Sequence, residues 1–210
     1  MITRNTISII GVTGVLLFII AVVCGALLIP GYSHLSQYIS ESYAIDTKYG
    51  IYLRLFGYIP SGILMMLFCF FAVKHLPKNS ATPIATVAIG LFYGGGTLLT
   101  GIFPCDAGCN KEMIDPSLAQ FIHNLSGLLT YITVPFFVIV LGFAALKWQP
   151  LKTGKVILLC GFVSLTFLLL FFSQLNSPYG GLYQRILEGS ILTSLLVTAR
   201  YIKNYNHQAG

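Results

Sequence analysis

Charged side chains are scarce in this sequence. Only 9% of its 210 residues are Asp, Glu, Lys or Arg, whereas about a quarter of an ordinary soluble domain is charged. Such a composition excludes a water-soluble globular protein. The sequence is instead 56% hydrophobic, which is typical of a chain that lies largely within a lipid bilayer.

Two motifs that identify common hydrolases are also missing. The sequence contains no H-E-x-x-H pair of metal-binding histidines and no G-x-S-x-G nucleophile elbow. The sequence therefore gives no metal signal by itself, and a serine hydrolase is a weak hypothesis. We expect no cofactor, and a divalent metal ion remains an open alternative.

The hydrophobic residues gather in long runs. About 20 apolar residues are needed to cross a bilayer core of roughly 30 Å, so a chain of this length has room for six spans and little else. The sequence thus predicts an all-α protein, an integral membrane six-helix bundle that forms a single transmembrane domain over residues 1–210. The predicted helices cover residues 7–29, 51–73, 84–103, 119–146, 156–173 and 183–202.

Basic residues lie mainly on one side of this predicted bundle. Cytoplasmic loops of membrane proteins are enriched in Lys and Arg, so that side is expected to face the cytoplasm and to carry both chain termini. The net charge of +6 is explained in this way, and we expect no nucleic-acid partner. The basic residues in question are Arg4, Lys74, Lys78, Lys147, Lys152, Lys155, Arg200 and Lys203.

The first loop on the opposite side is rich in polar residues. Leu35, Tyr38 and Ile39 follow helical spacing after a cap at Ser33, which predicts a short helix at the membrane surface. Such a helix would hold His34, Ser36, Ser40 and Glu41 at the outer mouth of the bundle. A solvated amphipathic loop is the alternative.

The second loop on that side contains the segment FPCDAGC. A disulfide between Cys105 and Cys109 is expected if the loop faces an oxidising compartment, and it would fix the position of Asp106. Two free thiols remain an alternative.

Several polar residues lie within the outer ends of the predicted helices. His123 and Asn124 begin a polar face of the fourth helix, and ionisable groups inside a membrane are functional candidates by default. Arg54 is expected to pair with Asp106, Glu41 or Glu188. The alternative for Arg54 and Arg185 is that both simply extend to the membrane interface.

Three segments of the chain, GYSHLSQYISE, FPCDAGC and HNLSG, resemble the corresponding segments of a family known as domain of unknown function 998. That family consists of multi-pass membrane proteins of bacteria and archaea. The resemblance implies a cell membrane location, in bacteria the inner membrane. The charge distribution predicts that the polar site lies on the periplasmic or extracellular side. The resemblance implies no activity.

Two classes of function follow from these residues. The first is an outward-facing pocket that binds, and in one version hydrolyses, an anionic lipid or lipid-linked molecule. Its catalytic candidates are His34, Glu41, Asp106 and His123, its ligand-binding candidates are Ser36, Arg54, Asn124, Arg185 and Glu188, and a metal would use His34, Asp106 and His123.

The second class is a non-catalytic transporter, sensor or membrane assembly protein whose buried charges are structural. In either class the expected partners are membrane lipids and a lipid-like or small-molecule ligand. The sequence does not indicate an oligomeric state.

Overall fold

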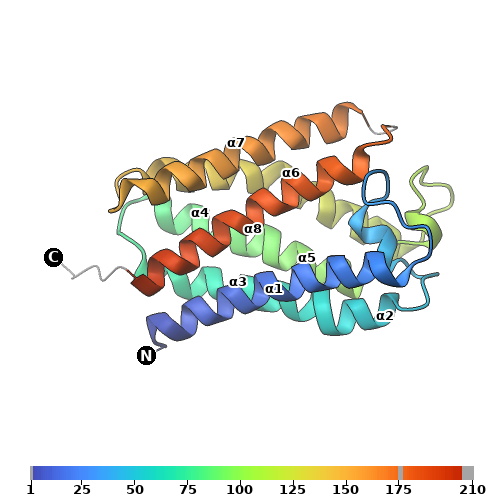
Figure 1. Cartoon of the computed structure of the whole chain (residues 1–210), viewed down its shortest axis with the longest axis horizontal. Coiled ribbons are helices and arrows are strands. Elements are labelled where there is room, and N and C mark those ends of the chain that lie inside the picture. Colours follow the sequence, from blue (N-terminus) through green and yellow to red (C-terminus); the bar gives the residue numbers. More distant parts are fainter. Residues whose placement is uncertain (1, 175–176, 205–210) are drawn as a thin grey trace.

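The computed structural model describes residues 2–174 and 177–204, which form an elongated bundle of helices (Figure 1). In this described part the chain forms no strand. Six long helical stretches account for most of it. Four of them are single helices: α1 (Arg4–Leu28), α6 (Leu118–Ala145), α7 (Leu151–Ser173) and α8 (Gly180–Asn204). The second stretch consists of α2 (Gly50–Leu53), η2 (Arg54–Tyr58), α3 (Ile59–Ala72) and η3 (Val73–His75). The third stretch consists of α4 (Ala81–Ile89), η4 (Gly90–Gly94) and α5 (Gly95–Ile102).

The six stretches form a closed ring. Each stretch packs against the one before it in the sequence, and α8 packs back against α1 as well as against α7. The start of α1 and the end of α8 therefore lie at the same end of the bundle (Figure 1). The loops at the opposite end include two short 3-10 helices, η1 (Ile39–Tyr43) and η5 (Ala107–Cys109).

The prediction of an all-helical bundle is confirmed, and most helix boundaries agree with the predicted runs to within three residues. The largest difference is at α7, which begins at Leu151 rather than at residue 156. Lys152 and Lys155 led the sequence interpretation to exclude this first turn. The turn is helical because Thr153 and Gly154 are buried on one side while both lysines remain exposed on the other.

The second and third stretches each contain a π-helical turn. The first, η2, ends immediately before Ile59 and Pro60, and the second, η4, contains Tyr93. Proline has no backbone N–H to donate, which favours a locally irregular hydrogen-bond pattern before it. A π-helical turn contains one more residue than an α-helical turn, so it changes the direction in which the side chains of that turn point. Here these turns direct two fully buried tyrosines, Tyr58 and Tyr93, toward the interior of the ring.

The second and third stretches pack against each other at glycines. A Cβ atom added to Gly94 would lie 2.6 Å from the backbone nitrogen of Met66, and one added to Gly62 would lie 2.6 Å from that of Leu98. Only a residue without a side chain permits this approach. Gly62 and Gly94 therefore set the distance between the second and third stretches.

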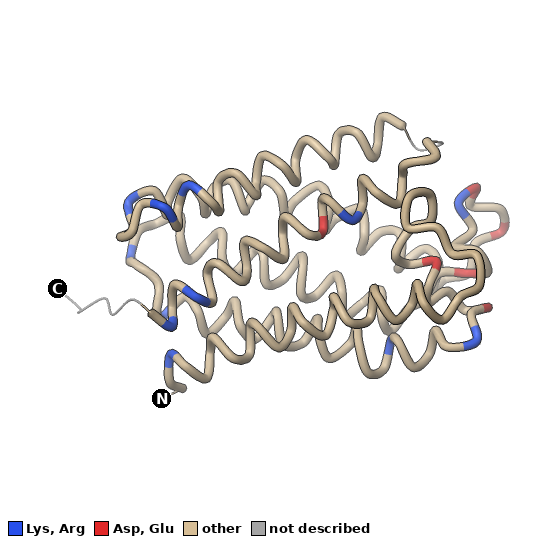
Figure 2. Tube along the Cα trace, in the orientation of Figure 1, with Lys and Arg blue, Asp and Glu red and all other residues tan. Residues whose placement is uncertain are grey.

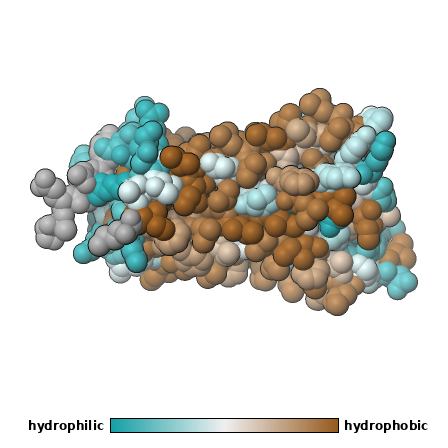
Figure 3. Space-filling model, turned by 90° about the horizontal axis from the view of Figure 1, so that it is seen from below, coloured by the Kyte–Doolittle hydropathy of each residue, from teal (hydrophilic) through white to brown (hydrophobic). Residues whose placement is uncertain are grey.

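The surface of the bundle is divided along its length. A broad hydrophobic belt separates hydrophilic residues at the two ends (Figure 3). Within the described residues, five stretches are long and apolar enough to cross a membrane, namely α1, Gly50–His75, Ala81–Ile102, α6 and α7. The protein is accordingly a multi-pass membrane protein with helices of membrane-spanning length.

The last helix, α8, differs from the other five in composition. It is 25 residues long and would extend about 37 Å at 1.5 Å per residue, but it carries Arg185, Glu188, Arg200 and Lys203. Two of its polar residues face inward, since Gln184 and Glu188 are 8% and 7% exposed, whereas Arg200 and Lys203 are exposed. Part of the unusual polarity of α8 therefore belongs to the bundle interior.

Candidate functional site

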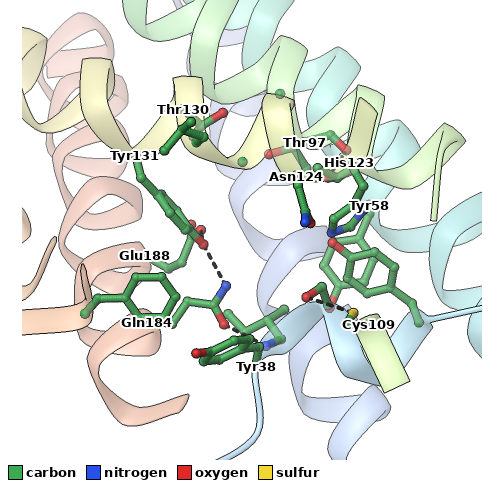
Figure 4. A pocket seen from close by; sticks show the side chains of 18 of the residues that line it. Tyr38, Tyr58, Thr97, Cys109, His123, Asn124, Thr130, Tyr131, Gln184 and Glu188 are labelled. Carbon is green, nitrogen blue, oxygen red and sulfur yellow. Dashed lines mark hydrogen bonds between the residues drawn. The ribbon is translucent and has the colours of Figure 1, made fainter. Parts of the chain in front are cut away.

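A cavity of about 540 Å³ lies inside the half of the bundle that is remote from the chain termini. Every helical stretch contributes to its wall, as do the loops that contain η1 and η5. Figure 4 shows polar side chains that converge on it from different helices. Its polar lining residues are Ser40, Thr97, Thr100, Lys111, His123, Asn124, Thr130, Gln184 and Glu188, and its aromatic ones are Phe18, Tyr38, Tyr43, Tyr58, Tyr93, Tyr131, Phe171 and Phe172.

The carboxylate of Glu188 is the acidic group in the cavity wall. The Tyr93 hydroxyl donates a hydrogen bond of 2.6 Å to its Oε2 atom, and the Tyr131 hydroxyl donates one of 2.8 Å to its Oε1 atom. Three helical stretches are therefore joined at this carboxylate. A buried carboxylate that accepts two phenol hydrogen bonds is held firmly in one orientation.

Gln184 extends this network to the first outer loop. Its Nε2 atom donates to the Tyr131 hydroxyl at 2.7 Å, and its Oε1 atom accepts the backbone N–H of Ile39 at 2.7 Å (Figure 4). Gln184 and Glu188 are one helical turn apart, so both face the same side of α8. A continuous chain of hydrogen bonds thus runs from the loop into the cavity.

Aromatic rings form two opposing groups in the cavity wall. In one group, Phe171 lies 5.2 Å from Tyr38 and 5.9 Å from Tyr131, measured between ring centroids. In the other, Tyr58 lies 5.4 Å from Phe18 and 4.3 Å from Tyr43. Such rings provide a large apolar surface that also carries polar hydroxyls.

One of these tyrosine hydroxyls is not satisfied by a full hydrogen bond to the described residues. Tyr58 is only 1% exposed; among the described residues its hydroxyl interacts with Ser42, but no contact satisfies it with full hydrogen-bond geometry. A buried polar group without a partner costs roughly 1–3 kcal/mol. Tyr58 therefore offers a donor and an acceptor to a molecule in the cavity.

His123 and Asn124 lie in the cavity wall on α6, as expected. The Nδ1 atom of His123 donates to the carbonyl oxygen of Phe103 at 2.9 Å, which fixes the ring. Asn124 accepts a hydrogen bond of 2.9 Å from Gln120, whose own Oε1 atom accepts the N–H of Asp106. The start of α6 is thereby joined to the second outer loop.

Arg185 stabilises the first outer loop instead of facing the cavity. Its Nη1 atom donates to the carbonyl oxygens of His34, Gln37 and Gly181, and its Nη2 atom donates to the Tyr32 hydroxyl. The short helix predicted to follow Ser33 is wrong in extent: the loop's 3-10 helix η1 begins only at Ile39. One physical reason is that carbonyl groups that would continue a helix are occupied by Arg185.

The pairing predicted for Arg54 is wrong. No acidic side chain of the described residues lies within 4.0 Å of it, and its buried Nε atom has no hydrogen-bond partner. The side chain is half-buried on η2, beside exposed Leu55 and Phe56, and it does not line the cavity. The alternative, in which Arg54 extends to the membrane interface, stays a prediction.

Glu41 has a structural environment at the mouth of the cavity. One of its oxygens accepts the N–H of Tyr38 at 2.8 Å and forms an ion pair of 2.7 Å with Lys111, the one ion pair that the described residues contain. The ammonium group of Lys111 also lies 4.3 Å from the ring centroid of Tyr38. A carboxylate and a tyrosine ring together hold this amine.

His34 and Ser36 do not reach the cavity. His34 is exposed, with its ring 5.7 Å from that of Tyr32, and Ser36 donates its backbone N–H to the hydroxyl of Ser33. In the described part of the chain, no three His, Cys, Asp or Glu side chains lie close enough to hold a metal ion. The structure therefore does not bring His34, Asp106 and His123 together.

Asp106 binds Ser117, the N-cap residue of α6. Its two oxygens accept the hydroxyl of Ser117 at 2.5 Å and the backbone N–H of Ser117 at 3.0 Å. These hydrogen bonds, the hydroxyl first, hold the pKa of Asp106 below its ordinary value. Cys105 and Cys109 lie next to each other across this turn, with Cα atoms 4.8 Å apart, within the range that a disulfide requires.

The three segments singled out in the sequence thus border one cavity. GYSHLSQYISE contributes Tyr38, Ile39 and Ser40, while FPCDAGC contributes Cys109. HNLSG contributes His123, Asn124 and Gly127. A family model described as "Protein of unknown function (DUF998)" matches residues 12–201, nearly the whole chain.

The chain belongs to the DUF998 family. The resemblance seen in the sequence is thereby confirmed. No curated protein and no solved structure matches the chain. The function of this family member has to be argued from the cavity itself.

The sequence interpretation missed two residues of the Glu188 network, Tyr93 and Gln184, and it placed Tyr131 on the polar face of the fourth helix without assigning it to a site. The two tyrosines lie within apolar runs, where they are indistinguishable from packing residues. A signal was present in α8, because Gln184 and Glu188 occupy one face of an otherwise apolar helix. That pattern predicts a polar interior partner, although it does not identify the tyrosines.

Proposed function

We propose that this DUF998 protein spans the membrane six times, with α8 as the sixth span, and that both termini lie in the cytoplasm. Support comes from the charge distribution: basic residues gather at the end of the bundle where α1 begins and α8 ends, and the acidic residues lie toward the other end (Figure 2). Cytoplasmic ends are enriched in Lys and Arg. The cavity would then open toward the periplasm or the cell exterior. Reporter fusions at Lys78 and Glu112 would test this, with cytoplasmic activity expected only at Lys78.

We further propose that the protein binds an amphipathic molecule in this cavity. The observation that carries it is a cavity that has aromatic walls, contains an anchored polar network and borders the lipid-facing surface. Its volume of about 540 Å³ lies within the roughly 300–1,000 Å³ of small-molecule sites. A ligand with an apolar chain and a polar head group matches such a wall.

Access from the membrane is supported by Leu128 and Phe172. Leu128 lines the cavity, but on α6 it shares a face with Leu125 and Ile132, which are exposed and do not line it. Phe172 lines the cavity from α7 and is 39% exposed. An apolar chain could therefore extend from the cavity into lipid between α6 and α7.

Binding is proposed in preference to hydrolysis. Of the four catalytic candidates, His34, Glu41 and Asp106 are absent from the cavity wall, and the last two are engaged in the contacts of the outer loops. His123 alone lines it. The anionic head group expected from the sequence relied on Arg54 and Arg185, neither of which lines the cavity.

Gly127 allows this proposal to be tested. It lies in the cavity wall on α6, and a Cβ atom added there would meet no atom within 4 Å, so Gly127→Phe introduces a ring into free space. Gly95 on α5 is equally unobstructed and does not line the cavity. Gly95→Phe is therefore a matched control.

The measurement is the amount of amphiphile that stays bound to protein purified in nanodiscs, determined by native mass spectrometry. We expect the wild type and Gly95→Phe to retain one bound amphiphile per chain and Gly127→Phe to lose most of it. Equal retention by all three folded proteins would show that the cavity does not hold the molecule.

A further inference from the structure

We infer that the head group recognised in this cavity is an organic ammonium group, and that Glu188 supplies the negative charge that binds it. This inference rests on the proposed function, because it assigns a chemical class to the ligand of the same cavity. It starts from the hydrogen bonds of Glu188 and from the residues that surround it.

Both oxygens of Glu188 act as acceptors. The Tyr131 hydroxyl itself accepts a hydrogen bond from Gln184, which leaves its proton for Glu188 Oε1, and the Tyr93 hydroxyl donates to Oε2. A protonated carboxylic acid would need to donate from one oxygen. An ionised carboxylate accepts both of these hydrogen bonds without reversal of either donor.

Among the described residues, this carboxylate has no cationic partner. No Lys, Arg or His of residues 2–174 and 177–204 forms an ion pair with Glu188, which is 7% exposed. Arg185, one turn away on α8, directs its Nη atoms to the loop carbonyls and to Tyr32. An isolated charge inside a membrane protein is costly unless a partner neutralises it. The cavity beside Glu188 is where a positively charged ligand group would provide that neutralisation.

The surroundings of Glu188 favour an organic cation over a metal ion. The carboxylate is the single acidic group lining the cavity, so the several oxygen ligands of a bound divalent ion are missing there. Aromatic rings instead line the same cavity: Tyr93 and Tyr131 donate hydrogen bonds to Glu188, and Phe171 packs against Tyr131. The faces of such rings attract ammonium groups.

The protein already holds one ammonium group in this manner. At the mouth of the cavity, the amine of Lys111 lies 2.7 Å from a Glu41 oxygen and 4.3 Å from the ring centroid of Tyr38. A carboxylate and a tyrosine ring thus form a site for an amine at the rim. Deeper in the cavity, Glu188 with Tyr93 and Tyr131 offers the same combination, without an amine from the protein.

Four probes of defined charge separate the elements of this inference. Dodecyltrimethylammonium carries the cation and a chain, dodecanol carries the chain alone, tetramethylammonium carries the cation alone, and dodecyl phosphate carries the opposite charge. Dissociation constants are measured by native mass spectrometry on the full chain in nanodiscs. We expect dodecyltrimethylammonium to bind about tenfold or more tightly than dodecanol, and dodecyl phosphate to bind weakest.

The variant Glu188→Gln removes the charge and keeps one acceptor oxygen, while its NH2 group takes the place of the other oxygen. We expect it to abolish the preference for dodecyltrimethylammonium over dodecanol. If Glu188→Gln does not fold, the wild type and Tyr93→Phe are tested instead. Tighter binding of dodecyltrimethylammonium than of dodecanol by both proteins supports the inference, and equal binding contradicts it. Tight binding of tetramethylammonium would indicate a small free amine as the ligand, and binding only with the chain attached would indicate a lipid.

The failure of this inference is distinguishable from that of the proposed function. One outcome is that dodecyltrimethylammonium and dodecanol bind with equal affinity and that Gly127→Phe abolishes the binding of both. This result would overturn the ammonium assignment and would still support an amphiphile site in the cavity. Absence of binding by every probe would overturn both. A preference for dodecyl phosphate would show that the cavity recognises an anion.

Discussion

The hydroxyl group of Tyr131 on α6 donates a hydrogen bond of 2.8 Å to the carboxylate of Glu188 on α8. The two helices each pack mainly against α7, which lies between them in the ring, so this bond crosses the cavity wall where direct helix contact is sparse. The same hydroxyl accepts a hydrogen bond from Gln184. The site and the fold are thus stabilised by the same side chains.

Replacement of Tyr131 by Phe is expected to lower the free energy of unfolding by about 1–3 kcal/mol, because both Glu188 and Gln184 lose a buried partner. The measurement is reversible unfolding in mixed micelles. Tyr52→Phe, at a position that is 59% exposed, is the control and should cost little. Similar losses for the two variants would mean that the bond to Glu188 contributes nothing particular to stability.

Replacement of Arg185 by Lys is expected to loosen the first outer loop. One ammonium group cannot reproduce the planar guanidinium that contacts the carbonyls of His34 and Gln37 and the hydroxyl of Tyr32. We expect a loss of about 1–3 kcal/mol in stability and faster hydrogen exchange in residues 32–43. Unchanged exchange there, with Arg200→Lys as the reference, would contradict this role.

The cap formed by Asp106 and Ser117 should make stability depend on pH. The pKa of Asp106 is lowered from 3.8 by hydrogen bonds from the Ser117 hydroxyl and N–H, so its stabilisation is complete above 3.8 and is lost as the pH falls through the lowered pKa. Asp106→Ala should therefore be less stable than the wild type at pH 7, and the difference should shrink in acid.

The partner residue provides the control for this cap. Ser117 accepts the N–H of Gln120 as the N-cap of α6, so Ser117→Ala should cost about 0.5–2 kcal/mol. In the Ser117→Ala background, the pH-dependent difference caused by Asp106→Ala should be greatly reduced. A difference that stays constant from pH 7 to acid would rule out ionised Asp106 as its source.

Cys105 and Cys109 are expected to form a disulfide in protein taken from its native membrane. Their Cα separation of 4.8 Å permits the bond, and the proposed orientation places them in an oxidising compartment. Alkylation followed by mass spectrometry should modify these two cysteines only after reduction. Under denaturing conditions Cys24, Cys69 and Cys160 should react without reductant. Modification of Cys105 and Cys109 before reduction would exclude the bond.

Much of the fold follows from elementary features of the sequence. Long apolar runs predicted helices close to those observed, because the length and composition of a membrane span are strongly constrained. The error at α7 arose because exposed Lys152 and Lys155 flank buried Thr153 and Gly154 within one helical turn. A charge count treats that turn as a loop, whereas helical packing depends on which face each residue occupies.

The site was predictable in location and less so in detail. His123, Asn124 and Glu188 were identified because polar groups in apolar runs are costly, and all three line the cavity. Tyr93 was missed and Tyr131 was not assigned to a site, since a tyrosine in a span is usually a packing residue. The assignment of Arg185 to a ligand was not supported, because its contacts depend on a loop conformation that the sequence pattern does not specify. Arg54 does not line the cavity, because its place on η2 directs it elsewhere.

The central claim, an amphiphile held in this cavity, is tested most directly by an experimental density map of the protein in lipid nanodiscs. The account predicts elongated density inside the cavity, with its head near Glu188 and Tyr131 and its chain leaving between Leu128 and Phe172. A map in which the cavity is closed by packed side chains, or holds only separate water molecules, would contradict the account.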